Sequence, residues 1–148
     1  MSIKIKNPAD PIETVASHEE NTADEIDDII TNAISAQKLW ANIPQPERGN
    51  IIKLFLDALE VKSEDIALSM TREMGKTLSE SKGEIAKAVG EGRATADRAG
   101  APIGEVFPSQ IAGTISYTFR RPRGVVLGIN PWNFPFSTPL RKAVPALL

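Results

Sequence analysis

The sequence has 148 residues, of which 41% are hydrophobic and 24% are charged, a balance typical of a globular domain with a buried core. Its formal net charge of −2 argues against a dedicated nucleic-acid-binding protein, and no apolar run is long enough to cross a membrane. The chain contains no cysteine, so these residues can form no disulfide, thiolate zinc site or cysteine nucleophile, and we expect no metal site. The N-terminus lacks a secretory signal, which favours a cytoplasmic protein.

The N-terminal part of the chain predicts two strands and a first helix. Residues 3–16 alternate weakly around the turn NPADP, as a pair of edge strands would, and His18 is assigned to a solvated loop. Thr22 and Glu25 form a capping-box pattern. The helical period that follows predicts one buried stripe, made of Ile26, Ile29, Ile30, Ala33, Ala36 and Trp40.

Three more helices are marked by start and stop signals. Pro46 suits the first turn of the second helix, whose predicted inner face is Ile51, Ile52, Phe55, Ala58 and Leu59. Ser63 is the expected N-cap of the third, which buries Ile66, Ala67, Met70 and Met74 before Gly75 ends it. The fourth lies within residues 77–99, and its glycines require close packing on the face formed by Ile85, Ala88, Val89, Gly92, Ala96 and Ala99.

The apolar period then changes from that of helices to that of strands. Residues 104–121 predict a hairpin, and the apolar run GVVLGI (124–129) predicts a central parallel strand covered on both faces. Residues 137–148 have helical spacing, with Leu140, Val144 and Leu147 inward and a kink expected at Pro145. Because the sequence stops inside this helix, we expect the chain to be cut short.

The motif NPWNFP (130–135) directly follows the predicted central strand. Ligands in doubly wound α/β folds bind beyond the carboxyl ends of such strands. The two prolines restrict the loop, which should therefore be stiff and present the amide of Asn133. A rigid amide donor can stabilise an oxyanion, but an asparagine in a tight loop can equally bind nearby backbone. The residues alone leave both interpretations open.

The run RPRGVVLGINPWNFPFSTPLRKAVPALL closely resembles the aldehyde dehydrogenase superfamily, whose members carry P-x-G-V, PWNFP and K-x-x-PAL in this order. TREMGK is similar to the family's E-x-GK element, and NPAD to its NPA turn. The resemblance covers essentially the whole chain. It implies the N-terminal portion of a semialdehyde dehydrogenase-like enzyme that oxidises an aldehyde with NAD or NADP, through a cysteine thiohemiacetal and thioester.

The resemblance also implies roles for single residues. Asn133 matches the asparagine of the oxyanion hole, and Phe134 matches an aromatic residue of the aldehyde tunnel. The positions that match contacts to the adenosine side of NAD(P) are Ile129, Asn130, Pro131 and Trp132, although Asn130 replaces a common threonine or isoleucine. Matches with an expected structural role are Glu73, Lys76 and Lys142. The catalytic cysteine and glutamate come later in relatives, so this chain alone is expected to be inactive.

The fold implied is α/β, with helices packed on a Rossmann-like parallel sheet. The expected segments are an N-terminal strand arm (1–21), a helical part of the cofactor-binding domain (22–101), an oligomerisation hairpin (102–122) and a first core strand with the motif loop and a shortened helix (123–148). A homo-oligomer, dimer or tetramer, is expected at full length, with no nucleic-acid or membrane partner.

Arg141 leaves two alternatives open. Arginine before the lysine is similar to the subgroup that acts on semialdehydes carrying a distal carboxylate, such as succinic semialdehyde, and a guanidinium can bind a carboxylate with two hydrogen bonds. The alternative is an ion pair within the chain or between subunits. The function also has an alternative, a stand-alone non-catalytic module that docks onto relatives or acts as a scaffold.

Overall fold

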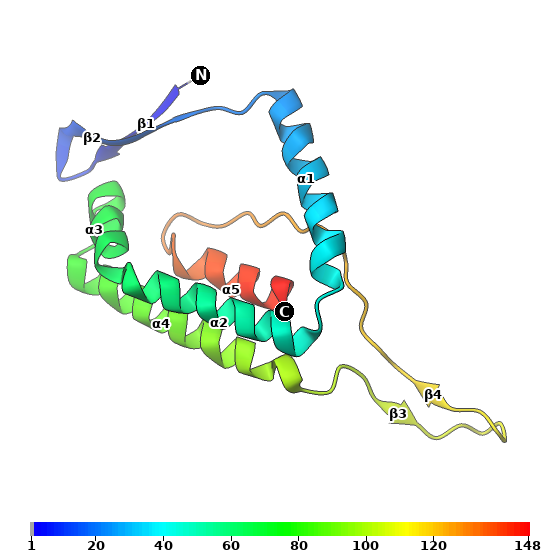
Figure 1. The fold of residues 1–148 in the computed structure, drawn as a ribbon. Helices are drawn as coiled ribbons and strands as arrows, with labels where there is room; N and C mark the ends of the chain where they lie inside the picture. Colours follow the sequence, from blue (N-terminus) through cyan, green and yellow to red (C-terminus); the bar gives the residue numbers. More distant parts are fainter. Residues whose placement is uncertain (1) are drawn as a thin grey trace.

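The computed structural model describes residues 2–148, in which helices pack around a small core, an N-terminal hairpin lies against them and a second hairpin projects away (Figure 1). The helices α2 (Gln45–Val61), α4 (Leu78–Ala96) and α5 (Ser137–Leu147) pack along one another, and α3 (Ser63–Met74) packs on the N-terminal half of α4. A short 3₁₀ helix, η1 (Asp97–Gly100), continues α4. The four predicted helices before residue 100 are all present.

The N-terminal hairpin consists of β1 (Ser2–Asn7) and β2 (Asp10–Glu19), paired antiparallel with Ile3 opposite His18. The predicted strand pair is confirmed. The assignment of His18 to a loop is wrong, because β2 continues past it, although its side chain is exposed as expected. An ion pair between Arg72 of α3 and Glu13 ties this hairpin to the helices.

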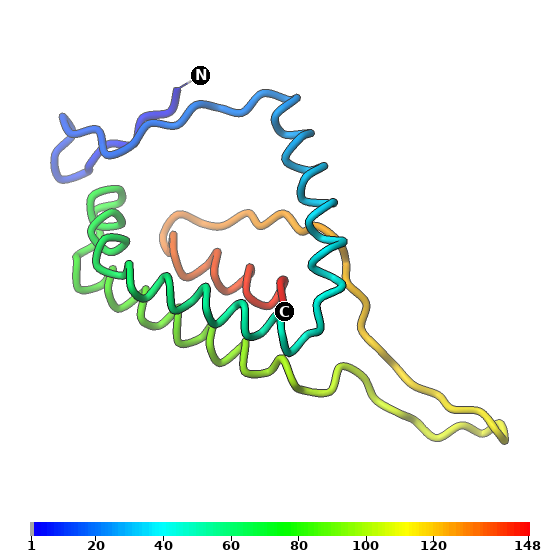
Figure 2. Tube along the Cα trace, in the orientation of Figure 1, coloured from blue at the N-terminus to red at the C-terminus, as the bar shows by residue number. Residues whose placement is uncertain are grey.

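Helix α1 (Ala23–Ala41) begins with the predicted capping box, in which Glu25 N donates to Thr22 Oγ1 (3.2 Å) and Thr22 N donates to Glu25 Oε2 (2.7 Å). The predicted burial of its stripe is wrong within the described chain, since no residue of α1 is buried. The tube in Figure 2 shows why: α1 stands away from the other helices and approaches them at its C-terminal end. There the Trp40 indole N–H donates to Leu147 O (2.7 Å).

The core is formed by α2, α3, α4 and α5. Its buried members are Ile52, Leu56, Ala67, Met70, Ile85, Ala88, Val89, Ala96, Leu140 and Val144. On α2 the predicted face is rotated, because Leu56 is fully buried while Phe55 is 49% exposed. On α3, Lys62 occupies the N-cap in place of the expected Ser63, and Gly75 ends the helix with a φ of 77°.

The face predicted for α4 is confirmed at every position, including Ala99 on η1. Close packing explains Gly92, where an added Cβ would lie 2.9 Å from Leu56 Cδ2. It does not explain Gly83 and Gly90, since nothing lies within 4 Å of a Cβ at either position. Of these three glycines of α4, only Gly92 is therefore required by close packing.

The second hairpin, β3 (Val106–Phe107) and β4 (Ser116–Tyr117), projects away from the helices and confirms the predicted strand pair (Figure 1). Residues 124–129 form no strand, and Leu127 is 85% exposed. The predicted buried strand is thus wrong within residues 2–148, because a central strand needs neighbours on both edges and no other described segment pairs with it. Helix α5 continues past Pro145, and Leu147 is more exposed than predicted.

Candidate functional site

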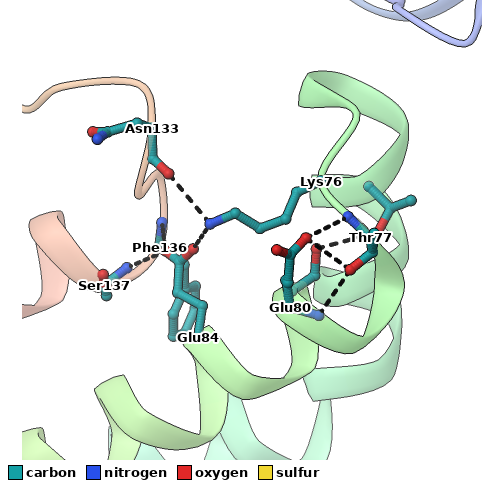
Figure 3. Close-up of polar contacts among 9 residues, drawn as sticks. Lys76, Thr77, Glu80, Glu84, Asn133, Phe136 and Ser137 are labelled. Atoms are coloured by element: carbon teal, nitrogen blue, oxygen red, sulfur yellow. Dashed lines mark hydrogen bonds and ion pairs between the residues drawn. The ribbon is translucent and has the colours of Figure 1, made fainter.

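The motif loop lies where residues 130–136 turn back from the extended segment into α5, opposite the junction of α3 and α4 (Figure 3). The junction is a tight turn. Gly75 takes a left-handed conformation that ends α3, and Thr77 caps α4 through a capping box with Glu80. Lys76 is held between these two caps, so its side chain leaves the backbone in a defined direction, toward the loop.

Glu84 caps the N-terminus of α5 from a different helix. Its Oε1 accepts hydrogen bonds from Phe136 N (3.1 Å) and Ser137 N (2.9 Å), whereas the N-cap residue Phe136 supplies no side-chain cap. A carboxylate at this position satisfies two otherwise unpaired N–H groups and interacts favourably with the helix dipole. Because Glu84 is only 7% exposed, the interaction is poorly screened by water.

Lys76 completes the arrangement. Its Nζ donates to Glu84 Oε2 (2.5 Å) and to the backbone carbonyl of Asn133 (3.2 Å), and it lies 4.4 Å from the centre of the Phe134 ring. The lysine side chain is 13% exposed and the Glu84 side chain 3% exposed, so this is a buried ion pair with most of its hydrogen-bonding capacity used. We call Lys76 and Glu84 the clamp pair.

The pKa of Glu84 reflects opposing effects. Burial by itself would raise it, but the hydrogen bond from Lys76, those from the backbone of Ser137 and Phe136, and the lysine charge together hold the pKa below its ordinary value. Glu84 is therefore ionised when it caps α5 near neutral pH.

The side chain of Asn133 points away from the clamp pair while its backbone faces it (Figure 3). Within residues 2–148 no hydrogen bond engages its carboxamide, and the residue is exposed. The alternative in which Asn133 bonds to its own loop through its side chain is therefore not what this chain shows.

Of the neighbouring positions 129–132, all are exposed except Asn130, which is partly buried. Lys142 of α5 donates to Ile129 O (2.7 Å), the structural helix-to-loop contact expected of this lysine. Asn130 Nδ2 makes a long hydrogen bond to Gly128 O (3.4 Å), and its Oδ1 is buried without a partner among the described residues. Trp132 is 78% exposed. Pro131 is exposed as well.

Arg141 lies apart from the clamp pair. Its Nε and Nη2 donate to the two carboxylate oxygens of Glu91 on α4 (2.5 and 3.0 Å). The hydrogen bonds from Arg141 lower the pKa of Glu91, and the same pairing raises the pKa of Arg141. An ion pair within the chain, one of the two alternatives for this residue, is thus present. It is solvent-accessible, with side chains 48% and 40% exposed, so the guanidinium could exchange this partner for another carboxylate.

Sequence reasoning missed Glu84. A signal was present, because Glu84 lies on the inward face of α4, four residues before Ala88 and beside Ile85. A charged residue on a buried helical face requires a partner. Identifying that partner as Lys76 and the start of α5 required the tertiary structure.

Within residues 2–148 no helix is long and apolar enough to span a membrane, and no group of acidic or histidine side chains is arranged to hold a metal ion.

The fold is that of solved dehydrogenase structures. An aldehyde dehydrogenase from Brucella melitensis biovar abortus 2308 matches with a TM-score of 0.94 and 34% identity, over 99% of this chain and 30% of that chain. An NADP-dependent glyceraldehyde-3-phosphate dehydrogenase from Bacillus halodurans C-125, solved as a complex with NADP, matches with a TM-score of 0.91 and 32% identity, over 99% and 32% of the two chains.

Comparison of the sequence with known proteins identifies the same family. The model of the aldehyde dehydrogenase family matches residues 1–148, and the chain belongs to that family. An alpha-ketoglutaric semialdehyde dehydrogenase from Bacillus subtilis (strain 168) is 38% identical over 146 residues, 99% of this chain and 30% of that protein. The chain therefore spans about a third of the length of the relatives it matches.

Proposed function

We propose that this chain is the N-terminal portion of an NAD(P)-dependent aldehyde dehydrogenase that oxidises an aldehyde to the carboxylic acid. Asn133 donates its amide N–H to the substrate oxygen as negative charge develops there. The observation that carries this proposal is the loop itself: its backbone is bound by a buried ion pair while the Asn133 carboxamide is left free.

The chemistry of the loop suits this role. A donor stabilises an oxyanion best when it is held in place before the reaction, because no free energy is then spent on reorienting it. The clamp pair restricts the backbone from the Asn133 carbonyl to Ser137, and Pro131 and Pro135 reduce the remaining freedom of the loop. The cysteine that would form the thiohemiacetal and thioester lies outside these residues, since the chain has none.

The residues at 129–132 fit a dinucleotide cofactor. Ile129 and Trp132 offer exposed apolar surface for a ring system, and the buried Oδ1 of Asn130 lacks a donor. We propose that Ile129, Asn130, Pro131 and Trp132 contact the adenosine side of NAD or NADP. When bound, the cofactor accepts the hydride, while these residues hold and orient it.

A carboxylate-bearing semialdehyde is the substrate class we propose. The support is that relatives such as the B. subtilis protein are named as semialdehyde dehydrogenases, and that Arg141 has a guanidinium in an exposed, exchangeable pair. Phe134, half exposed beside Lys76, is proposed to line the path of the aldehyde. The β3–β4 hairpin is proposed to join subunits of a dimer or tetramer, because it projects away from the helices (Figure 1) and carries exposed apolar side chains.

The test is the Asn133→Ala substitution in the complete protein that carries these residues. Loss of one oxyanion donor should lower kcat by roughly 100- to 1000-fold, with a much smaller change in the KM for NAD(P). Asn32→Ala, an exposed asparagine on α1, is the control and should retain wild-type kinetics. An unchanged kcat for Asn133→Ala would refute the oxyanion role, and a wild-type protein inactive on all aldehydes would favour the non-catalytic module.

A further inference from the structure

We infer that Lys76 and Glu84 are positioning residues for the reaction, because together they set the place of the Asn133 amide. This inference rests on the proposed function and extends it to residues that lie on the other side of the loop from the substrate. Neither residue touches the reacting atoms in this account. Each acts through the backbone of residues 133–137.

The contacts reach Asn133 directly. Lys76 Nζ donates to the carbonyl of Asn133 itself (3.2 Å), so the peptide plane that follows the Asn133 Cα has a fixed orientation. Glu84 accepts from Phe136 N and Ser137 N, which fixes the chain three and four residues later. Since Lys76 and Glu84 also bind each other (2.5 Å), a single buried ion pair holds both ends of this short segment.

The pair is itself rigidly mounted. Lys76 lies between the left-handed Gly75 and the capped Thr77, and Glu84 lies on the buried face of α4. An added Cβ at Gly75 would lie 2.8 Å from Pro8 Cγ, so the turn that carries Lys76 is packed against the N-terminal hairpin. The Phe134 ring further limits where the ammonium group can move, because it lies 4.4 Å away.

The consequence for catalysis follows from the geometry of a rigid donor. A displacement of about 1 Å in a reacting or stabilising group can lower a rate roughly 100-fold. Removal of the lysine charge frees the Asn133 carbonyl and leaves Glu84 buried with its strongest partner missing. The loop should then sample positions in which the Asn133 amide no longer points at the substrate oxygen.

The experiment measures steady-state kinetics of the complete protein with four variants: Lys76→Met, Glu84→Gln, Asn133→Ala and the double variant Lys76→Met with Asn133→Ala. We expect Lys76→Met to lower kcat by roughly 10- to 100-fold with little change in the KM for NAD(P). In the Asn133→Ala background the same substitution should lower kcat almost no further, because the effects of substituting residues that act through one group are not additive.

A matched control for Lys76 is available on α4, the helix that carries Glu84. Lys82 also forms an ion pair, with Glu64 at 2.6 Å, but both partners are solvent-exposed. Lys82→Met should leave kcat unchanged. If Lys76→Met does not fold, Lys76→Arg keeps the charge, and Glu84→Gln keeps the size of the carboxylate. Each should lower kcat less than Lys76→Met would, and in each the loss should again disappear in the Asn133→Ala background.

A second measurement does not depend on activity. Hydrogen exchange of the Phe136 and Ser137 amides should be faster in Glu84→Gln than in the wild type, and unchanged in Lys82→Met. If Lys76→Met lowered kcat equally in the wild type and in the Asn133→Ala variant, the inference would be overturned while the proposed function would stand. A wild-type protein that oxidises no aldehyde would refute the proposed function. Unchanged hydrogen exchange of Phe136 and Ser137 in Glu84→Gln would then also refute the role of the clamp pair in holding the loop.

Discussion

Glu84 is a buried carboxylate that joins α4 to the turn after α3, eight residues earlier in the sequence, and to the start of α5, 52 residues later. It binds Lys76 from the end of α3 and two backbone N–H groups at the start of α5. Buried ion pairs are costly to form but also costly to break, because removal of one partner leaves the other uncompensated. The local consequence is that the motif loop and α5 cannot shift independently of α4.

The stability of the protein should depend on the ionisation of Glu84. Its pKa is lowered in the folded state, so its contribution is complete above its ordinary value of 4.5 and is lost as the pH falls through the lower folded value. Thermal midpoints measured from neutral to acidic pH should therefore fall less steeply below about pH 4.5 in Glu84→Gln than in the wild type. Parallel curves would contradict this assignment.

The proposed role of Arg141 in substrate binding can be tested by substituting either Arg141 or its ion-pair partner Glu91. If the guanidinium binds a substrate carboxylate, Arg141→Leu should raise the KM for a semialdehyde with a distal carboxylate by roughly tenfold or more, because a charge-assisted hydrogen bond is lost. The KM for a neutral aldehyde should change less. Glu91→Gln should have the opposite effect on the carboxylated substrate, since it removes the competing carboxylate. If Arg141→Leu changed the KM of both aldehydes equally, the role of Arg141 would be limited to its ion pair with Glu91.

At the scale of elements, α4 is the helix on which the others depend. It packs against α2, α3 and α5, and its small residues allow these helices to approach closely. α1 differs, because it has a capping box and an apolar face but no buried residue. An apolar face with helical spacing is therefore buried in α4 but, within the described residues, has no buried member in α1.

The glycines of α4 provide a matched comparison. Gly92→Ala places a Cβ 2.9 Å from Leu56 Cδ2, and Leu56 is fully buried, so the core must shift at a cost of about 1–3 kcal/mol. Gly90→Ala meets nothing within 4 Å and gains helix propensity of up to about 1 kcal/mol. Thermal or denaturant midpoints should therefore fall for Gly92→Ala relative to Gly90→Ala. The reverse order would contradict the packing described for α4 and α2.

At the scale of the whole molecule, much apolar surface is uncovered within the described chain. The face of α1, the segment 124–129 and both β3 and β4 carry large exposed hydrophobic residues. The solved relatives that share this fold are about three times as long as this chain.

Residues 1–148 expressed alone should not oxidise aldehydes, because the chain has no cysteine to attack the carbonyl. Their affinity for NAD should also be weak, because positions 129–132 form only one side of the proposed cofactor site. Isothermal titration calorimetry would measure the affinity for NAD, and an NADH absorbance assay would measure aldehyde oxidation. Micromolar binding of NAD by this polypeptide would contradict the assignment of the rest of the site to other residues.

The sequence by itself determined the family, the helix caps at Thr22 and Gly75, and the whole inner face of α4. These depend on local backbone preferences, on a strong apolar period or on a specific motif, all of which short stretches of sequence contain. Only the tertiary structure decided that α1 and residues 124–129 are exposed, that the face of α2 is rotated toward Leu56, and that Lys76 and Glu84 hold the loop. Burial and ion pairing depend on which distant segments meet, and that information is not contained in any one segment's own pattern.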